Sequence, residues 1–483
     1  MKYQPTLLLS ILLIACQTST DTQADLTEEI ATIENSLTLP IIAKGEKPQT
    51  MNIEKQMEKY NVAGASIAVV RDGKIRWTKG YGIANSETKV TTETLFQAGS
   101  ISKPLAALAA LKLAQDGKLD LDEDVNNYLK DWKIPESSFT QNKKVTVRLL
   151  LTHSAGLTVH GFPGYMQSDT FPTITAVLTG KGNTNSIESF IEPDSLWRYS
   201  GGGYTVMEKV VEDVSGMSLE QYMAGILKGM GMTNSTYEQP ISEKWHSQLS
   251  AAYTSEGELY EGLWHNYPEQ AAAGLWTTPT DLAKYYIHMQ RILGGKEDGI
   301  LNKHTVEQML TKHRNDWGLG PSLSKSGDSL LFGHGGKNAG FTNEMTGFAY
   351  RGDALIIMTN SDQGGKLNGE VLRALSKYYE LDIRNPREVE VYDISESSLD
   401  SLVGTYQFEE QVDGIGDYIV DVSRSGSRLV VDDPNSGDID TLTATSSNAF
   451  IVFQKGDNVE FQIDSDTTIG FLWNDRFQFY KKN

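Results

Sequence analysis

The chain has 483 residues, with 43 Lys and Arg against 63 Asp and Glu, and its formal net charge is −20 at pH 7. This acidity, together with the lack of a block of basic residues, argues against nucleic-acid binding. The length indicates two domains, or one large domain with an addition. The single cysteine, Cys16, excludes an intramolecular disulfide.

The N-terminus has the pattern of an export signal. The apolar run from Thr6 to Ala15 is too short to span a membrane as a stable helix. It ends in Leu13-Ile14-Ala15-Cys16, which resembles a bacterial lipoprotein lipobox, and the resemblance implies cleavage before Cys16 and lipidation of its thiol. The alternative, an ordinary signal peptide, leaves a lone exported Cys without a partner. We therefore expect residues 1–16 to be a lipoprotein signal.

The resemblance also sets the expected location. Gln17, and not Asp, follows the lipidated position. By similarity to enterobacterial sorting, this favours the outer membrane over the inner one. The sequence thus predicts a lipid-anchored protein of the bacterial cell envelope, at the periplasmic face or the outer membrane.

The next stretches lead into the first folded part. Residues 17–50 are rich in Thr, Glu, Asp and Gln, which predicts a polar, solvated tether. A short helix is expected from about Asn52 to Tyr60. Two apolar runs, Gly64–Val70 and Ile75–Tyr81, are joined at Asp72-Gly73, which is a strong signal for a β-hairpin.

The stretch Phe96–Pro104 carries the first candidate site. An Ala- and Leu-rich helix follows it from Leu105 to Ala114, and Asp116-Gly117 is expected to end that helix. Ser100 then falls at the helix N-terminus, and Lys103 lies three residues on, on the same helix face.

This spacing suits nucleophilic catalysis. A Ser needs a base beside it, and a buried Lys near positive helix-end dipoles has a lowered pKa that lets it act as one. The free N–H groups of the first turn can stabilise an oxyanion. The alternative is that Ser100 is only an N-cap and that the Ser-x-x-Lys spacing arises by chance.

His153 and Tyr199 are the next candidates. A helix over Val145–Leu157 contains His153, for which packing or capping is preferred to a Ser–His pair because another base is available. Tyr199 stands on a Gly-rich loop before an amphipathic helix over Thr205–Val214. A Tyr there can be a general base if cations lower its pKa, and a buried Tyr in a turn is the alternative. A further helix is expected to start at Thr280.

The third stretch is Leu330–Phe341, which contains His334-Gly335-Gly336-Lys337 and precedes further apolar runs up to Asn360. These runs predict strands of one antiparallel sheet. A phosphate loop is excluded, because no Ser or Thr follows Gly336-Lys337 and Asn338 stands where a dinucleotide fingerprint needs its last Gly. The glycines fit a strand edge that a ligand approaches closely.

The last part of the chain changes character. Residues 385–398 are polar and charged and contain Pro386, which indicates a linker. Residues 399–483 then read as short strands separated by turns, which predicts a small antiparallel barrel or sandwich. The strands are expected at 402–408, 418–422, 428–431, 449–453, 459–463, 469–473 and 477–480.

Three motifs now stand in order: Ser100-x-x-Lys103, Tyr199-Ser200-Gly201 and His334-Gly335-Gly336. Together they resemble the serine β-lactamase and penicillin-binding-protein superfamily. The similarity is greatest to its class C β-lactamase-like branch, with D-Ala-D-Ala carboxypeptidases and family VIII esterases, and it covers about Ile53 to Leu381.

The resemblance implies an α/β (α+β) fold over residues 51–385, in which an antiparallel sheet is flanked by helices and joined by a helical lobe, with the site between them. It implies that the strands of residues 399–483 form a lipocalin-like barrel with an architectural or substrate-gating role. No cofactor is expected, and a metal hydrolase is the weakest option, because the eight His residues show no paired ligand spacing and Cys16 lies in the expected anchor.

The resemblance also implies acyl transfer. Ser100 would attack a carbonyl carbon, Lys103 and Tyr199 would move the proton, and the N–H groups of Ser100 and Lys337 would hold the oxyanion. His334, Gly335, Gly336 and Lys337 would bind the substrate.

Two departures narrow the expected activity. Gly201 stands where the family often has Asn, and His334 stands where it often has a Lys that attracts the substrate carboxylate. Efficient β-lactamase activity is therefore not expected. A D-amino-acid peptidase or an esterase is predicted, acting on small molecules or peptides that include peptidoglycan fragments. The alternative is a catalytically silent scaffold that binds cell-wall fragments or a partner.

Overall fold

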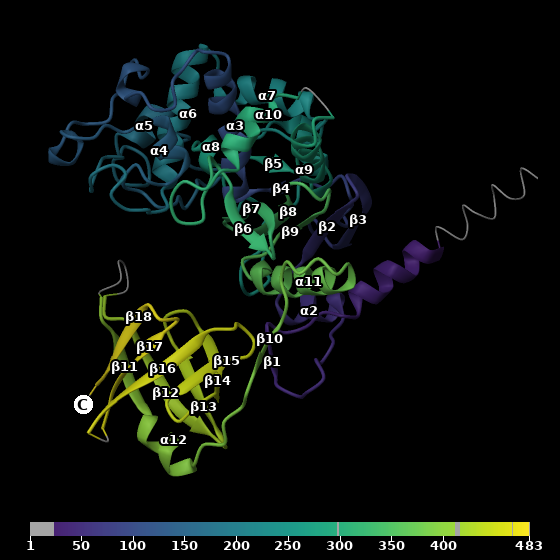
Figure 1. Ribbon diagram of the computed structural model, residues 1–483, viewed down its shortest axis with the longest axis vertical. Helices are drawn as coiled ribbons and strands as arrows, with labels where there is room; N and C mark the ends of the chain where they lie inside the picture. The colour runs from purple at the N-terminus through teal and green to yellow at the C-terminus, as the bar shows by residue number, and fades with distance from the viewer. Residues whose placement is uncertain (1–23, 297–298, 411–415, 466, 483) are drawn as a thin grey trace, which may run out of the picture. The chain divides into compact units, whose positions relative to one another are not determined.

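The computed structural model describes residues 24–296, 299–410, 416–465 and 467–482. Cys16 and the predicted lipobox lie outside these residues. The chain divides into two compact units, one over Ile53–Asn368 and one that combines Met1–Asn52 with Gly369–Asn483 (Figure 1). No helix among the described residues is both long and apolar enough to cross a membrane.

The first unit is built on a six-stranded antiparallel sheet with the order β3-β2-β9-β8-β7-β6. Asp72 and Gly73, between β2 and β3, both have positive φ angles of 52° and 71°, as a tight hairpin turn requires. The predicted hairpin and the predicted antiparallel strands are thus confirmed. The strands are β2 (Gly64–Arg71), β3 (Lys74–Gly82), β6 (Ser322–Ser326), β7 (Ser329–Asn338), β8 (Phe341–Phe348) and β9 (Ala354–Thr359). A separate two-stranded ladder pairs β4 (Phe96–Gln97) with β5 (Trp276–Thr277).

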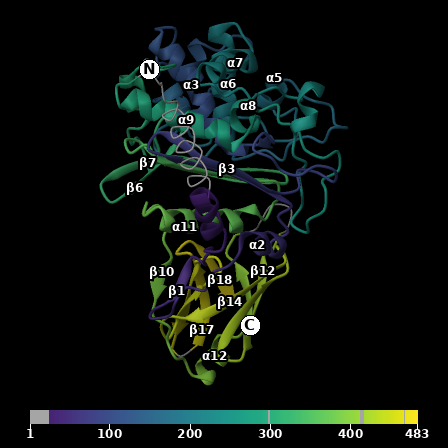
Figure 2. The ribbon, with the colours of Figure 1, turned by 90° about the vertical axis from the view of Figure 1, so that its right-hand side faces the viewer.

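Helices flank this sheet. Helix α9 (Pro279–Leu293) packs against β2 and β9, and its Tyr286 hydroxyl donates to the carbonyl of Phe332 in β7 at 3.0 Å. The helical lobe lies to one side of the sheet in both views (Figures 1 and 2). The predicted mixed α/β architecture is therefore confirmed. The other helices of this unit are α2 (Ile53–Lys59), α3 (Ser102–Gln115), α4 (Val147–Leu151), α5 (Ile174–Leu178), α6 (Gly201–Ser215), α7 (Leu219–Gly229), α8 (Gln270–Ala273) and α10 (Lys303–Met309).

Helix α3 is the centre of the lobe. Nearly every residue from Ser102 to Leu113 is buried, and the helix contacts α6, α7 and α8. The cause is its Ala- and Leu-rich sequence, which offers small and apolar side chains on every side. The helix ends at Gln115, and Gly117 follows in a left-handed conformation with φ of 69°. Ser102, Lys103 and Pro104 are among the buried residues, so the start of the helix is packed against its neighbours.

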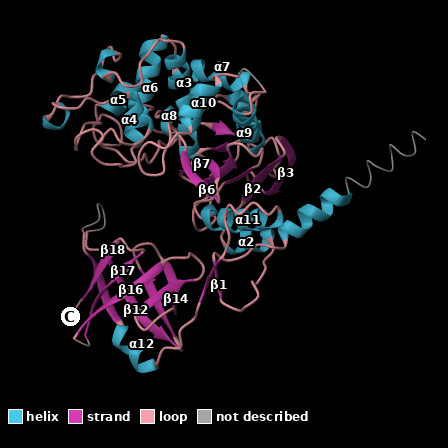
Figure 3. Cartoon of the chain, in the orientation of Figure 1, coloured by secondary structure: helices cyan, strands magenta, loops and turns pink. Residues whose placement is uncertain are grey.

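The second unit carries a closed antiparallel barrel, β11-β12-β13-β14-β15-β16-β17-β18, as expected (Figure 3). Alternate side chains such as Val420, Val422 and Phe461 point inward and are buried. Helix α12 (Glu396–Leu402) leads into the first strand and contributes Leu399 and Leu402 to the barrel core. The strands are β11 (Gly404–Phe408), β12 (Ile419–Ser425), β13 (Arg428–Asp433), β14 (Asp438–Ala444), β15 (Ala449–Val452), β16 (Asn458–Asp464), β17 (Thr467–Trp473) and β18 (Phe477–Lys481).

The segment expected to be a solvated tether differs in its described part. Residues 24–34 are helical, Ile33 and Leu37 are buried, and β1 (Ile41–Ala43) pairs in parallel with β10 (Arg387–Val389). Leu26, Ile30 and Ile33 recur at helical spacing, so they form one apolar face of this helix despite the polar composition, and Leu37 follows the helix in a bridge to Met51. Strand β10 lies within residues 385–398, so part of the segment predicted as a linker is a paired strand. Helix α11 (Gly364–Tyr378) begins in the first unit and continues in the second.

Candidate active site

Ser100 lies in a short 3₁₀ turn, Gly99–Ile101, directly before α3. This turn touches the backbone of β7. A Cβ on Gly99 would lie 2.6 Å from the Lys337 backbone nitrogen, and Gly99 has a positive φ of 55°. A Cβ on Gly336 would lie 1.9 Å from the Ala98 carbonyl oxygen. Glycine at both positions therefore lets the nucleophile turn and β7 meet backbone to backbone.

Lys103 joins Ser100 from the first turn of α3. Its Nζ donates to Ser100 Oγ at 3.0 Å and to the carbonyl of Ala272, in α8, at 2.8 Å. The side chain is only 3% exposed, and this burial lowers the pKa of Lys103 to about 7. A large share of Lys103 is therefore neutral at pH 7, and its neutral amine can accept a proton from Ser100.

Tyr199 approaches from the other side. Its phenol is hydrogen-bonded to the Ser100 side chain, and Lys103 Nζ lies 5.0 Å from its ring centroid. Loss of hydration raises the pKa of Tyr199 above its ordinary value, and the Ser100 hydrogen bond only partly offsets this. The sequence argument required a lowered pKa for a Tyr base, and the direction here is the opposite. At neutral pH the phenol is protonated and can donate.

Ser200 explains where Tyr199 stands. Its Oγ accepts from the N–H of Gly203 at 2.9 Å and so caps α6, which begins at Gly201, earlier than predicted. A Cβ on Gly202 would lie 2.7 Å from the carbonyl oxygen of Thr158. The Ser200 cap and the close contact of Gly202 with Thr158 hold the start of α6 in place, and with it Tyr199 just before the helix.

His153 is a packing residue, as expected. Its ring lies against Tyr199, with centroids 4.1 Å apart, and its Nδ1 accepts from the Ser200 N–H at 3.1 Å. Burial and the nearby Lys103 hold the pKa of His153 well below its ordinary value, so the ring is neutral. Helix α4 ends at Leu151, before His153, and is shorter than predicted.

The third motif lies on β7, as predicted. The pairing of β7 with β6 ends at Gly333, so the strand from His334 onward is free of that neighbour where it passes the Ser100 turn. His334 is buried, its Nδ1 donates to the Gly335 carbonyl at 2.5 Å, and burial and then the nearby Lys103 lower its pKa to about 3. It is therefore a neutral side chain at physiological pH. The Lys337 side chain is exposed.

Several neighbours were not foreseen. Trp317 packs against His334, with ring centroids 5.4 Å apart, and also against Tyr199, at 6.0 Å. The Ala272 carbonyl orients Lys103. Asn338 donates to Gln97 Oε1 at 2.8 Å and ties β7 to the strand before Ser100. A backbone carbonyl has no sequence signal, and nothing in the local pattern around Trp317 connects it to the motifs.

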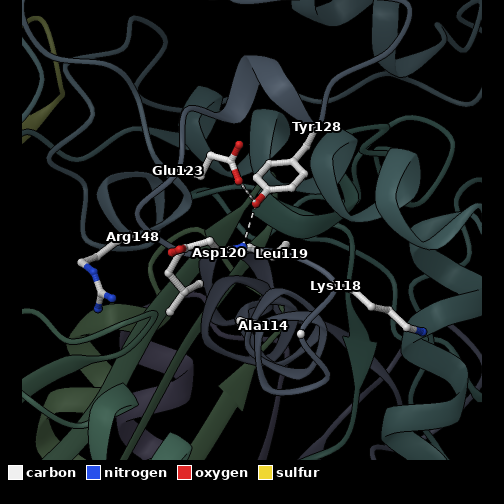
Figure 4. A pocket seen from close by; sticks show the side chains of 9 residues that line it. Ala114, Lys118, Leu119, Asp120, Glu123, Tyr128 and Arg148 are labelled. Carbon is white, nitrogen blue, oxygen red and sulfur yellow. Dashed lines mark hydrogen bonds between the residues drawn. The ribbon is translucent and has the colours of Figure 1, made fainter.

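A separate hollow of about 530 Å³ lies at the C-terminal end of α3 (Figure 4). Its lining includes paired polar side chains: the Tyr128 hydroxyl donates to Glu123 at 2.6 Å, and Arg148 donates two hydrogen bonds to Asp122, which lies outside the lining. None of the three motifs lines it. The hollow is lined by Ala114, Gly117, Lys118, Leu119, Asp120, Leu121, Glu123, Tyr128 and Arg148.

Comparison with known proteins agrees with this geometry. A family model described as Beta-lactamase matches residues 51–378. Protein flp of Staphylococcus aureus (strain N315) is 26% identical over 248 residues, which are 49% of this chain and 47% of flp. The chain thus spans about half the length of the curated relatives that it matches first.

Solved structures share the fold. The octameric penicillin-binding protein homologue from Pyrococcus abyssi has a TM-score of 0.59 at 23% identity, covering 89% of this chain and 98% of that one. The D-amino acid amidase from Ochrobactrum anthropi SV3, complexed with L-phenylalanine amide, has a TM-score of 0.55 at 21% identity, covering 68% and 98%.

Proposed function

The chain belongs to the beta-lactamase family, and on that premise we propose that it is a serine hydrolase that works through an acyl-enzyme on Ser100. One observation carries the proposal. The buried Lys103 amine, with a pKa of about 7, lies 3.0 Å from Ser100 Oγ. A nucleophile in contact with a base of matched pKa is the arrangement that acyl transfer requires.

The first half of the reaction follows from these contacts. Ser100 Oγ attacks the substrate carbonyl carbon while neutral Lys103 takes the hydroxyl proton. The negative charge moves to the carbonyl oxygen, which the N–H groups of Ser100 and Lys337 stabilise. The contact between the Gly99 turn and the Lys337 backbone nitrogen supports this pair of donors.

The second half returns the proton. The bond between the carbonyl carbon and the leaving group breaks, and the leaving nitrogen or oxygen takes a proton from Tyr199, which is protonated at neutral pH and is resupplied by Lys103. A water molecule then attacks the acyl carbon while Lys103 takes a proton from it. The bond between that carbon and Ser100 Oγ breaks, the acid product leaves, and Oγ receives the proton from Lys103. The order of roles follows from the two opposite pKa shifts.

The substrate class follows from His334. Because its ring is buried and neutral, it offers no cation to a free carboxylate at the position where related enzymes often have Lys. We propose substrates without a free carboxylate next to the scissile bond, such as D-amino-acid amides, peptides blocked at that position, or esters. The fold shared with a D-amino acid amidase supports this choice.

We also propose that Cys16 is lipidated and anchors the protein in the bacterial cell envelope, at the periplasmic face or the outer membrane. Peptidoglycan-derived peptides would then be within reach of the site. The lipobox-like sequence supports this proposal. Incorporation of labelled palmitate that is lost in Cys16→Ala would establish the anchor, and equal labelling of both proteins would contradict it.

A hydrolysis panel tests the function. D-alanine amide, D-alanyl-D-alanine, p-nitrophenyl butyrate and nitrocefin are incubated with the wild type, with Ser100→Ala and with Ser86→Ala, which changes an exposed serine of the first unit. We expect turnover of an amide or ester by the wild type and Ser86→Ala alone. Turnover that persists in Ser100→Ala would refute the proposal.

A further inference from the structure

The barrel of the second unit contains a cavity of about 500 Å³, within the range of small-molecule sites. It opens at the end where β11 and β17 finish, whereas α12 and the core residues Leu399 and Leu402 lie at the end where β11 starts. We call it the barrel pocket. It is lined by Phe408, Tyr418, Val420, Val431, Asp433, Ser436, Asp438, Asp440, Lys455, Asp457, Phe471, Trp473, Asn474, Phe477 and Phe479.

The walls of the barrel pocket are aromatic. Phe471 and Phe479 form a stacked pair, with ring centroids 4.7 Å apart and planes at 21°. The ring centroid of Phe408 lies 5.3 Å from that of Phe479 and 6.1 Å from that of Phe477. Phe477 is 40% exposed. These rings surround space that no described side chain fills, and an aromatic or apolar body would complete their packing.

The polar lining of the barrel pocket is acidic. Among its described lining residues four carboxylates stand against one ammonium, which gives 4 − 1 = 3 excess negative charges. Lys455 is shared by Asp438 and Asp440, at 2.8 Å each. Asp457 accepts from Trp473 Nε1 at 3.2 Å.

The remaining carboxylate, Asp433, is also held in place. Burial opposes its ionisation, but hydrogen bonds from Tyr418 and Ser436 outweigh this and lower the pKa of Asp433. These contacts hold the negative groups in fixed positions beside the aromatic walls.

We propose that the barrel pocket binds a small organic cation with an aromatic or apolar body. Its apolar part would displace water from the rings, and its positive group would lie among the aspartates and over the ring faces. An anion of the same shape would be repelled by the excess negative charge. This proposal stands apart from the acyl-enzyme, because no residue of the barrel pocket belongs to the three motifs.

A matched set of probes tests it. Naphthylmethyl-trimethylammonium, naphthylmethanol and naphthylmethanesulfonate share one ring system and differ in charge. Titration calorimetry with the purified protein is expected to give a Kd for the cation about tenfold below that of the alcohol, with no measurable binding of the sulfonate. The same values are expected for Ser100→Ala, which separates this pocket from the catalytic serine.

Two pairs of variants locate the binding. Phe477→Ala should weaken all binding roughly fivefold, whereas Tyr480→Ala, an exposed aromatic on the same strand outside the lining, should leave it unchanged. Asp457→Asn should reduce only the preference for the cation, and Asp464→Asn, at an exposed site outside the lining, should not. Equal affinity for cation and alcohol, no binding of any probe, or losses that are the same in pocket and control variants would overturn the proposal.

Discussion

Replacing Lys103 by Met is expected to abolish turnover and at the same time to stabilise the fold at low pH. In the folded protein burial lowers the pKa of Lys103 from 10.5 to about 7, whereas the unfolded chain keeps the ordinary value. Between these two values the unfolded state binds more protons, so the unfolding free energy rises with pH. Below pH 7 both states are protonated, and the full cost of the buried charge is present.

The size of the effect follows from the shift. A difference of 10.5 − 7 = 3.5 pKa units corresponds to about 5 kcal/mol at pH 6. By pH 9 about 2 kcal/mol of this cost remains. Met loses the hydrogen bonds of Lys103 to Ser100 and Ala272, which costs about 2 kcal/mol at every pH. The stability advantage of Lys103→Met should therefore shrink by roughly 3 kcal/mol between pH 6 and pH 9.

Urea unfolding followed by Trp fluorescence at pH 6, 7.5 and 9 measures this change. Lys112→Met is the matched control, since Lys112 lies on the same helix but is partly exposed and pairs with Asp116 at 2.5 Å. Its difference from the wild type should stay constant over the three pH values. For Lys103→Met, a difference in unfolding free energy from the wild type that stays constant or grows as the pH rises would refute the claim that buried Lys103 has a pKa near 7.

Further predictions concern the other parts of the site. Tyr199→Phe keeps the ring and removes the hydroxyl, so kcat should fall about 10²- to 10⁴-fold with unchanged thermal stability; an unchanged kcat would remove the phenol from the reaction. Gly336→Ala should abolish activity, because its Cβ would meet the Ala98 carbonyl, whereas Gly225→Ala, on α7 with nothing within 4 Å of an added Cβ, should fold and turn over normally; equal behaviour of the two would contradict the close contact. Ser200→Ala should lower the unfolding free energy by about 1 kcal/mol through the lost helix cap, measured by urea unfolding, and no loss would argue against the cap.

The sequence was informative where a local pattern and a tertiary role coincide. Helix α3, the β2–β3 hairpin and the order of the three motifs could be predicted, because the residues that form these local patterns also pack against one another in the folded protein. Strand β14 was missed, because Asp438–Ala444 reads Asp-Ile-Asp-Thr-Leu-Thr-Ala, in which the β-forming Ile and Thr residues stand between polar ones and make no apolar run. Its partners in the barrel determine its conformation, which is a tertiary effect that composition does not carry.

The same distinction applies within the site. The contact of Ser100 with Lys103 is encoded by helical spacing, so it could be predicted from their separation of three positions. Tyr199 is protonated because the surrounding groups bury its phenol. His334 is neutral because its ring is buried on β7. Both are properties of packing between segments that are distant in the sequence, and no pattern around either residue reveals them.

The most direct measurement is the intact mass of the protein after acid quench of its reaction with p-nitrophenyl butyrate and, separately, with a penicillin, for the wild type beside Ser100→Ala. The account predicts a mass increase of one acyl group on the wild type with at least one reagent, located on the peptide that contains Ser100, and none on the variant. The same adduct on Ser100→Ala, or an adduct located on another residue, would contradict it.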